Sequence, residues 1–179
     1  MDDEALLWRP AAPCPYVPPA TVLSLPMSAV QATVALLQRA GPRECGVFWY
    51  GPRDPGGHGL VQAVIAPLQA MSRGNYHVSP AAMSTMVSRL PDEQWKPLAQ
   101  IHSHPGGGIE HSRYDDEMIA SKRALSIVFP FYGRWAGPWP HGVGIHEYQN
   151  DYWHLLSAAH GAHRVQLTSE SHHTTEDLR

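Results

Sequence analysis

The segment from Leu98 to Asp115 constrains the fold of this chain more than any other stretch. It begins as an apolar run typical of a buried strand and continues through His102-Ser103-His104-Pro105 into three consecutive glycines. Pro105 cannot donate to a strand ladder, and the glycines allow the chain to turn back. Ser112, with an acid three residues later, is typical of a helix N-terminus. The segment therefore predicts a strand, a turn and a helix that lie close together.

Strand and helix signals alternate on both sides of this segment. Apolar runs bounded by turn residues predict strands over residues 21–25, 44–50, 60–67, 76–78, 98–102, 125–129, 142–148 and 152–156. Capping residues and helical spacing predict helices from Ser28 to the stop at Gly41-Pro42, from Pro80 to Arg89, and from Ser112 onward. The strands at 44–50 and 60–67 are separated by a glycine-rich turn, so we expect them to form a hairpin.

The composition bounds the number of domains. A chain of 179 residues, of which 43% are hydrophobic and 16% charged, can bury one core but hardly two. We expect a single domain over residues 20–158. It is preceded by an arm over residues 1–19, which has five prolines between positions 9 and 19 and is expected to run extended over the surface. It is followed by a polar tail over residues 159–179, a candidate for disorder.

Charge and cysteine usage exclude several classes of protein. A formal charge of -3 with no cluster of Lys and Arg argues against nucleic acid as a partner, because binding to phosphates needs a basic surface. Two cysteines do not make a disulfide framework. The acidic first residues do not resemble a secretory signal, and no apolar run approaches the roughly 20 residues that cross a bilayer. We therefore expect a soluble, cytoplasmic protein with no membrane partner.

His102, His104 and Asp115 form a candidate metal site. Residues two apart in a strand point to the same side, so the two imidazoles can converge on one ion, and a helix that begins at Ser112 can bring Asp115 to it. Three protein ligands leave a fourth position for water, which is the arrangement of a catalytic zinc. Separately, each half of the pattern has an ordinary explanation: two unremarkable histidines, and a capping box. Joined at this spacing, the two halves favour the metal site.

A zinc-bound water needs a base, and no Glu lies beside these histidines in the His-Glu-x-x-His manner. Glu44 stands at the start of an apolar strand, followed by Cys45-Gly46, and can face such a water. The alternatives are a solvated strand end, or Glu110 and Glu117, which are nearer in sequence. Ser112 can donate its hydroxyl to an oxyanion. Cys45 points away from Glu44 by strand alternation and is expected in the core.

The order of these residues resembles the JAMM (MPN+, or JAB) zinc metalloproteases. Glu44-Cys45-Gly46 before a strand, then His-x-His-Pro-x6-Ser-x2-Asp, matches the family motif, and the resemblance covers about residues 20–157. It implies an α/β fold with a mixed sheet flanked by helices. It also implies that His102, His104 and Asp115 hold zinc, with Glu44 as acid/base and Ser112 as oxyanion donor. Members hydrolyse peptide or isopeptide bonds after the C-terminal glycine of ubiquitin or ubiquitin-like proteins.

Residues 125–133 and 142–148 and Trp153 look like those of bacterial JAB proteins, which are encoded beside ubiquitin-activating-like and ubiquitin-conjugating-like enzymes, including in antiphage operons. The resemblance thus implies a ubiquitin-like partner with a Gly-ended tail, and those enzymes as further partners. The loops that correspond to the family's ubiquitin-gripping insertions are short or unlike the eukaryotic ones. Alternatives are a hydrolase acting on a sulfur-carrier protein or its amino-acid adduct, and a non-catalytic MPN scaffold. A RadC-like role with DNA is disfavoured by the lack of a basic surface.

Other aromatic and histidine residues have less specific interpretations. Trp135 and Trp139 either form a groove for an extended tail or pack over the core. Six other histidines of the C-terminal half are expected at the surface: His141, His146, His154, His160, His172 and His173.

Overall fold

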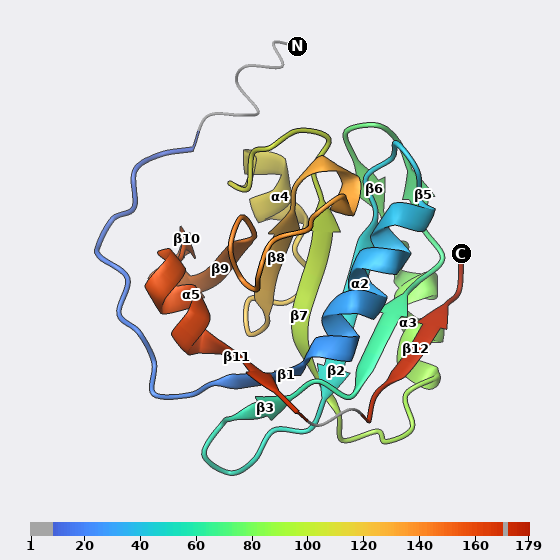
Figure 1. The fold of residues 1–179 in the computed structure, drawn as a ribbon, viewed down its shortest axis with the longest axis horizontal. Helices are drawn as coiled ribbons and strands as arrows, with labels where there is room; N and C mark the ends of the chain where they lie inside the picture. The colour runs from blue at the N-terminus through green and yellow to red at the C-terminus, as the bar shows by residue number, and fades with distance from the viewer. Residues whose placement is uncertain (1–8, 170–171) are drawn as a thin grey trace.

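A mixed seven-stranded sheet forms the centre of the protein in this computed structural model, which describes residues 9–169 and 172–179 (Figure 1). Its order is β10-β9-β8-β7-β2-β4-β12. Neighbouring strands are antiparallel except for two pairs, β7 with β8 and β4 with β12, which are parallel. The strands are β2 (Gly46–Gly51), β4 (Ala63–Ala66), β7 (Lys96–Ser103), β8 (Leu125–Phe129), β9 (Gly144–Gln149), β10 (Tyr152–Leu155) and β12 (Thr174–Asp177). The expected mixed sheet is confirmed.

Two smaller sheets lie beside it. One has the order β11-β1-β3, from β11 (Val165–Thr168), β1 (Leu23–Pro26) and β3 (Gly59–Leu60), and the other pairs β5 (Ala70–Met71) with β6 (Tyr76–His77). The single strand expected over residues 60–67 is therefore wrong, because its two halves join different sheets. The amide of Val61 donates to Ser24 of β1, whereas the amide of Gln62 donates to Tyr50 of β2. Only β4 forms the expected hairpin with β2.

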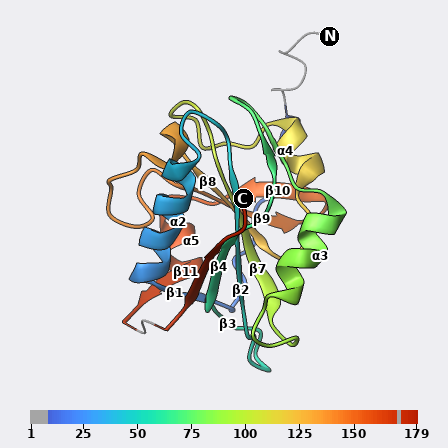
Figure 2. The same cartoon turned by 90° about the vertical axis from the view of Figure 1, so that its right-hand side faces the viewer.

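Helices cover both faces of the sheet (Figure 2). Helices α2 (Met27–Arg39) and α5 (Ala158–Arg164) lie on one side, and α3 (Pro80–Ser88) and α4 (Arg113–Met118) lie on the other. Helix α2 begins at Met27 with Pro26 as its N-cap and no side-chain cap, so the cap expected at Ser28 is wrong. Helix α3 begins as expected, since Ser79 accepts a hydrogen bond from the amide of Ala82 and proline occupies the first turn.

Strand β2 separates two apolar clusters because its side chains alternate between the faces of the sheet. Val47 and Trp49 belong to the larger cluster, which α2 covers, and Phe48 and Tyr50 belong to the smaller one beside α3. The buried indole Nε1 of Trp49 donates to Thr33 Oγ1 of α2 at 2.8 Å. The core therefore fixes α2 against the sheet by both packing and one buried hydrogen bond.

The C-terminal segment is more ordered than its polar composition suggests. Helix α5, β11 and β12 all lie within or beside the tail that we expected to be a candidate for disorder, so that expectation is wrong for its described residues. Strand β12 pairs with β4, and β11 pairs with β1. Sequence patterns missed these strands because short polar strands gain their stability from partners that are distant in sequence.

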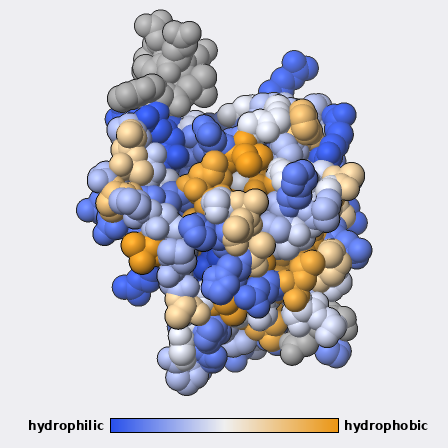
Figure 3. Space-filling model, turned by 60° about the vertical axis from the view of Figure 1, so that its left-hand side comes forward, coloured by the Kyte–Doolittle hydropathy of each residue, from blue (hydrophilic) through white to orange (hydrophobic). Residues whose placement is uncertain are grey.

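The N-terminal arm runs without regular secondary structure from Arg9 to Pro19, and the rest of the expected arm, residues 1–8, lies outside the described residues. It follows the end of the sheet that contains β9 and β10. Gln149 exchanges two hydrogen bonds with the backbone of Val17, and Tyr152 donates to the carbonyl of Pro10. The side of the molecule that the arm crosses carries both hydrophilic and hydrophobic residues (Figure 3).

The structure corrects one expectation about single residues and decides between two alternatives for another pair. His146 and His154 are buried, not at the surface, because β9 and β10 turn them inward. Trp135 and Trp139 pack over the core against Phe129, so the structure favours the packing interpretation over a groove.

Among the residues that the structure describes, no helix combines the length and apolar character needed to cross a membrane.

Candidate metal centre

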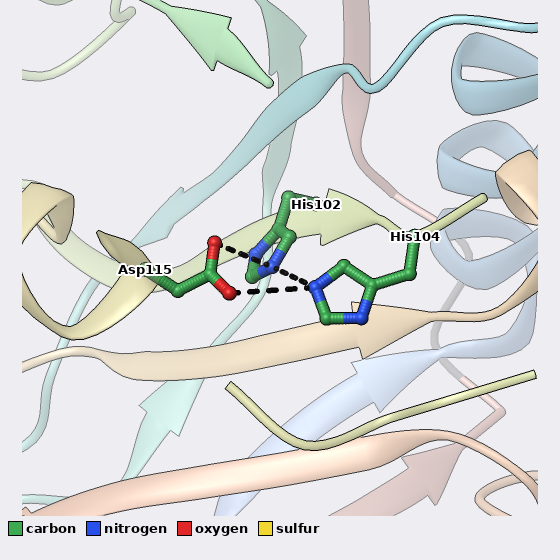
Figure 4. A group of neighbouring side chains, drawn as sticks. All are labelled: His102, His104 and Asp115. Carbon is green, nitrogen blue, oxygen red and sulfur yellow. Dashed lines mark hydrogen bonds and ion pairs between the residues drawn. The ribbon is translucent and has the colours of Figure 1, made fainter. Parts of the chain in front are cut away.

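The end of β7 and the start of α4 bring three metal-ligating side chains together (Figure 4). The Nε2 atoms of His102 and His104 lie 3.1 Å apart. Asp115 places Oδ1 3.4 Å from Nε2 of His102 and Oδ2 3.5 Å from Nε2 of His104. One ligand atom from each residue lies within 4.8 Å of the other two. The structure thus brings the three expected ligands into a group that can hold one metal ion.

Hydrogen bonds from β8 and from the turn after it hold the loop that follows β7. The amide of His104 donates to the carbonyl of Phe129 at 2.9 Å, and the carbonyl of His104 accepts from the amide of Tyr132 at 2.7 Å. The amide of Phe131 donates to Gly106 at 2.9 Å. Phe131 and Tyr132 both have positive φ, 52° and 54°, a conformation that costs about 1–2 kcal/mol for such residues. Two of the hydrogen bonds that hold the loop of His104 therefore come from residues with a strained backbone.

Ser112 and Asp115 form the capping box that was the ordinary explanation of this pattern. Ser112 Oγ accepts from the amide of Asp115, and Asp115 Oδ2 accepts from both the amide and the hydroxyl of Ser112 at 2.7 Å. The two interpretations are compatible, because Asp115 Oδ1 still faces His102. The cap orients the carboxylate toward the histidines.

The protonation of the three side chains suits a metal ion. His104 Nδ1 lies 3.0 Å from the carbonyl of Gly108, which can only accept, so Nδ1 carries a proton and Nε2 faces the other ligands. Burial lowers the pKa of His102 to about 4, so this imidazole is neutral at neutral pH. Burial disfavours the charged form of Asp115, but the imidazoles and the Ser112 hydrogen bonds outweigh it and hold its pKa well below the usual range. Two imidazole nitrogens and a carboxylate are a donor set that zinc prefers.

Glu44 lies beside this group. It immediately precedes β2, its amide donates to the carbonyl of Ser72, and its side chain is buried. It lines one pocket of about 580 Å³ together with His104, Ser112 and Asp115. Burial raises the pKa of Glu44 to about 7, with a smaller opposing effect of His104.

The other two acids considered as bases lie elsewhere. Glu117 forms an exposed ion pair with Arg113, and Glu110 lines a separate pocket with Arg9 and Tyr152. Among these three acids, only Glu44 lines the pocket that contains His104 and Asp115. Cys45 is fully buried, as expected for a core residue.

Two residues that the sequence did not single out shape the wall of the site. Gly46 lies opposite His102 in the β2–β7 register, and the Tyr76 ring lies 5.9 Å from the His102 ring. A side chain at position 46 would collide with the Tyr76 ring. A glycine inside a buried strand is itself a signal of such a close approach. The hydroxyl of Tyr76 accepts from Gln100 at 2.7 Å, which fixes the ring.

His111 is a third residue near the site that the sequence analysis did not single out. It is buried and lies between Asp116 and Ser126, with Nδ1 2.8 Å from Asp116 Oδ1 and Nε2 2.8 Å from Ser126 Oγ. Its ring stacks on that of His146 with centroids 3.7 Å apart, and it lies 5.8 Å from the ring of His102. No periodic pattern in the sequence indicates these contacts, because its partners come from three different elements.

Comparison with known proteins agrees with this arrangement. Residues 26–154 match the family model of the prokaryotic homologs of the JAB domain. No match was found among curated proteins. The solution structure of protein DSY2949 from Desulfitobacterium hafniense is similar in fold, with a TM-score of 0.63 and 18% identity over 83% of this chain and 94% of that chain. The matched segment contains the His102, His104 and Asp115 group, and the chain belongs to the prokaryotic JAB domain family.

Proposed function

We propose that this protein is a zinc-dependent peptidase or isopeptidase that cleaves after the C-terminal glycine of a ubiquitin-like protein. The proposed partners are that protein, with its extended Gly-ended tail, and the activating-like and conjugating-like enzymes that attach it to targets. The family and the His-His-Asp group support a metallohydrolase. The choice of substrate rests on the resemblance of the motif residues to JAMM proteases.

The observation that carries the proposal is the position of Glu44. Glu44 is buried and lines the same pocket as His104 and Asp115, and burial raises its pKa to about 7. A carboxyl group with such a pKa can both accept and release a proton at neutral pH, which is what a residue needs in order to serve as base and then as acid. A solvated Glu at a strand end would have neither the burial nor the raised pKa.

His102, His104 and Asp115 would hold the zinc ion, which when bound polarises a carbonyl group and lowers the pKa of water. Glu44 accepts a proton from the attacking water as the oxygen–carbon bond forms. It then delivers that proton to the nitrogen of the leaving amine as the carbon–nitrogen bond breaks. Ser112 lines the same pocket, and its hydroxyl, which donates to Asp115 Oδ2, can be recruited by an oxyanion that forms beside it.

The walls of the pocket suit a peptide backbone. Three of its lining residues are glycines, Gly74, Gly106 and Gly108, which expose peptide groups without side chains. Such groups can hydrogen-bond an extended tail, and small residues in that tail can approach the ligands closely.

A direct test compares Glu44→Gln with Glu110→Gln, which removes an exposed acid from a separate pocket. The probes are a panel of ubiquitin-like proteins, each fused through a Gly-Gly tail to a reporter, and the same fusions with Val-Val in place of Gly-Gly. We expect the wild type and Glu110→Gln to release the reporter from Gly-Gly fusions. Glu44→Gln should be slower by about 100-fold or more while it retains zinc. Equal rates for Glu44→Gln and the wild type, or equal cleavage of Val-Val fusions, would contradict the proposal.

A further inference from the structure

Helix α4 carries the third expected ligand, yet it is poorly packed. None of its six residues is buried. The loop before it is held through Gly106, whose carbonyl accepts from the amide of Phe131, and the segment after it is tied to β7 by one hydrogen bond, from the amide of Ala120 to Gln100 Oε1 at 3.0 Å. The capping box is internal to the helix, so it orients Asp115 within α4 but does not fix α4 relative to β7. Contacts from other elements must therefore set the distance between Asp115 and the histidines.

Asp116, the residue after the expected ligand, provides such contacts. Its Oδ1 accepts from Nδ1 of His111, whose Nε2 in turn lies 2.8 Å from Ser126 Oγ on β8. Since β8 pairs with β7 in parallel, with Val128 beside His102, this connection runs from α4 to the strand next to the histidines. One carboxylate oxygen of Asp116 is satisfied in this way.

Arg9, in the N-terminal arm, satisfies the other oxygen. Its Nε donates to Asp116 Oδ2 at 2.7 Å, and its Nη2 donates to the carbonyl of Trp153 on β10 at 2.7 Å. The guanidinium group also lies 4.7 Å from the centre of the Tyr152 ring. The Arg9 side chain is 13% exposed, which makes this a partly buried, charge-assisted connection between α4 and the edge of the sheet.

We propose that Arg9 is a positioning residue for the metal centre, which ties α4 to β10 and thereby holds Asp115 at the distance at which it shares an ion with His102 and His104. Arg9 lies outside residues 26–154, the segment that matches the family model. The inference rests on the proposed metal site and concerns affinity for the ion. Loss of a partner that orients a ligand typically lowers metal affinity by about 10–100-fold.

The test measures the zinc dissociation constant of the full chain by competition with a chromophoric chelator, and the visible spectrum of the cobalt-loaded protein. Arg9→Ala should raise the dissociation constant about tenfold and alter the cobalt bands, whereas Arg9→Lys, which keeps the charge, should restore part of the affinity. Two controls should bind as the wild type does. Arg113→Ala removes an exposed arginine of α4, and Tyr16→Phe loosens the arm elsewhere by removing its hydrogen bond to Glu147.

The outcomes separate this inference from the proposed function. If the wild type binds zinc and Arg9→Ala binds equally tightly with an unchanged cobalt spectrum, the positioning role of Arg9 is wrong and the proposed function stands. If Tyr16→Phe weakens binding as much as Arg9→Ala, general docking of the arm explains the effect, and the specific role is again wrong. If the wild type binds neither zinc nor cobalt, both proposals fail. Thermal melting of each variant verifies that the folded protein is being compared.

Discussion

The imidazoles of His102 and His104 face each other through their Nε2 atoms at 3.1 Å, with Asp115 beside both. His104 carries a proton on Nδ1, and its pKa is raised above the usual value, so below that pKa its Nε2 carries a second proton. In that state His102, which burial keeps neutral, accepts this proton's hydrogen bond through Nε2. A proton and a metal ion compete for the same space between these atoms.

Zinc binding should therefore release a proton from His104. Burial lowers the pKa of His104, but its hydrogen bond to Asp115 and the neighbouring charges raise it above the usual value overall. We expect the zinc dissociation constant to rise by up to about tenfold for each pH unit below that pKa. Isothermal titration calorimetry in buffers of different ionisation enthalpy measures the proton directly. A binding enthalpy that is independent of the buffer would contradict this prediction.

Burial of Glu44 should make the stability of the chelator-treated protein depend on pH. The folded-state pKa of about 7 lies above the unfolded value of about 4.3, so the folded state binds more protons between these pH values. The free energy of unfolding should thus fall as pH rises from about 4.5 to about 7. Relative to the wild type, Glu44→Gln should gain roughly 1–3 kcal/mol between pH 5 and pH 8. Urea unfolding at the two pH values checks this, and a constant difference between the two proteins would refute it.

Gly46→Ala should destabilise the protein and displace Tyr76 from His102. The added methyl group would collide with the Tyr76 ring, and overpacking of this kind costs about 1–3 kcal/mol. Gly74→Ala is a matched control, because an added methyl group there meets no atom within 4 Å. Thermal unfolding of both variants measures the difference. Equal stability of the two variants would show that Tyr76 can move away at no cost.

Thr33→Val should leave the buried indole N–H of Trp49 without its partner. An unsatisfied buried donor costs about 1–3 kcal/mol. Thr85→Val on the exposed side of α3 makes the same chemical change at a surface position and should have little effect. Urea denaturation compares the two variants, and an unchanged midpoint for Thr33→Val would mean that the hydrogen bond contributes nothing to the core.

Continuous apolar runs gave the most accurate predictions of structure. The run from Leu125 to Phe129 predicts β8 to the residue, because a strand buried on both faces needs no alternation and has clear ends. The break within residues 60–67 was not predictable in this way, because Val61 and Gln62 bond to strands that are distant in sequence. The same reason hides β12, whose polar threonines pair with β4.

The candidate site likewise contains residues that the sequence predicted and residues that it did not. Spacing alone brought His102, His104 and Asp115 together, since strand alternation and a helix N-terminus fix their directions locally. Arg9 and His111 were missed. Arg9 is 107 residues from Asp116, and His111 bonds to side chains from two elements, so neither contact leaves a local pattern. The close approach at Gly46 could have been predicted, because a glycine within a buried strand indicates that another group lies close to the backbone.

The most direct test of the account is the location of zinc in crystals of the full chain, measured by anomalous scattering at the zinc absorption edge. The account predicts one strong peak about 2.0–2.2 Å from Nε2 of His102, Nε2 of His104 and a carboxylate oxygen of Asp115. A map with no peak between these three side chains, or with zinc only at other histidines such as His172 and His173, would contradict it.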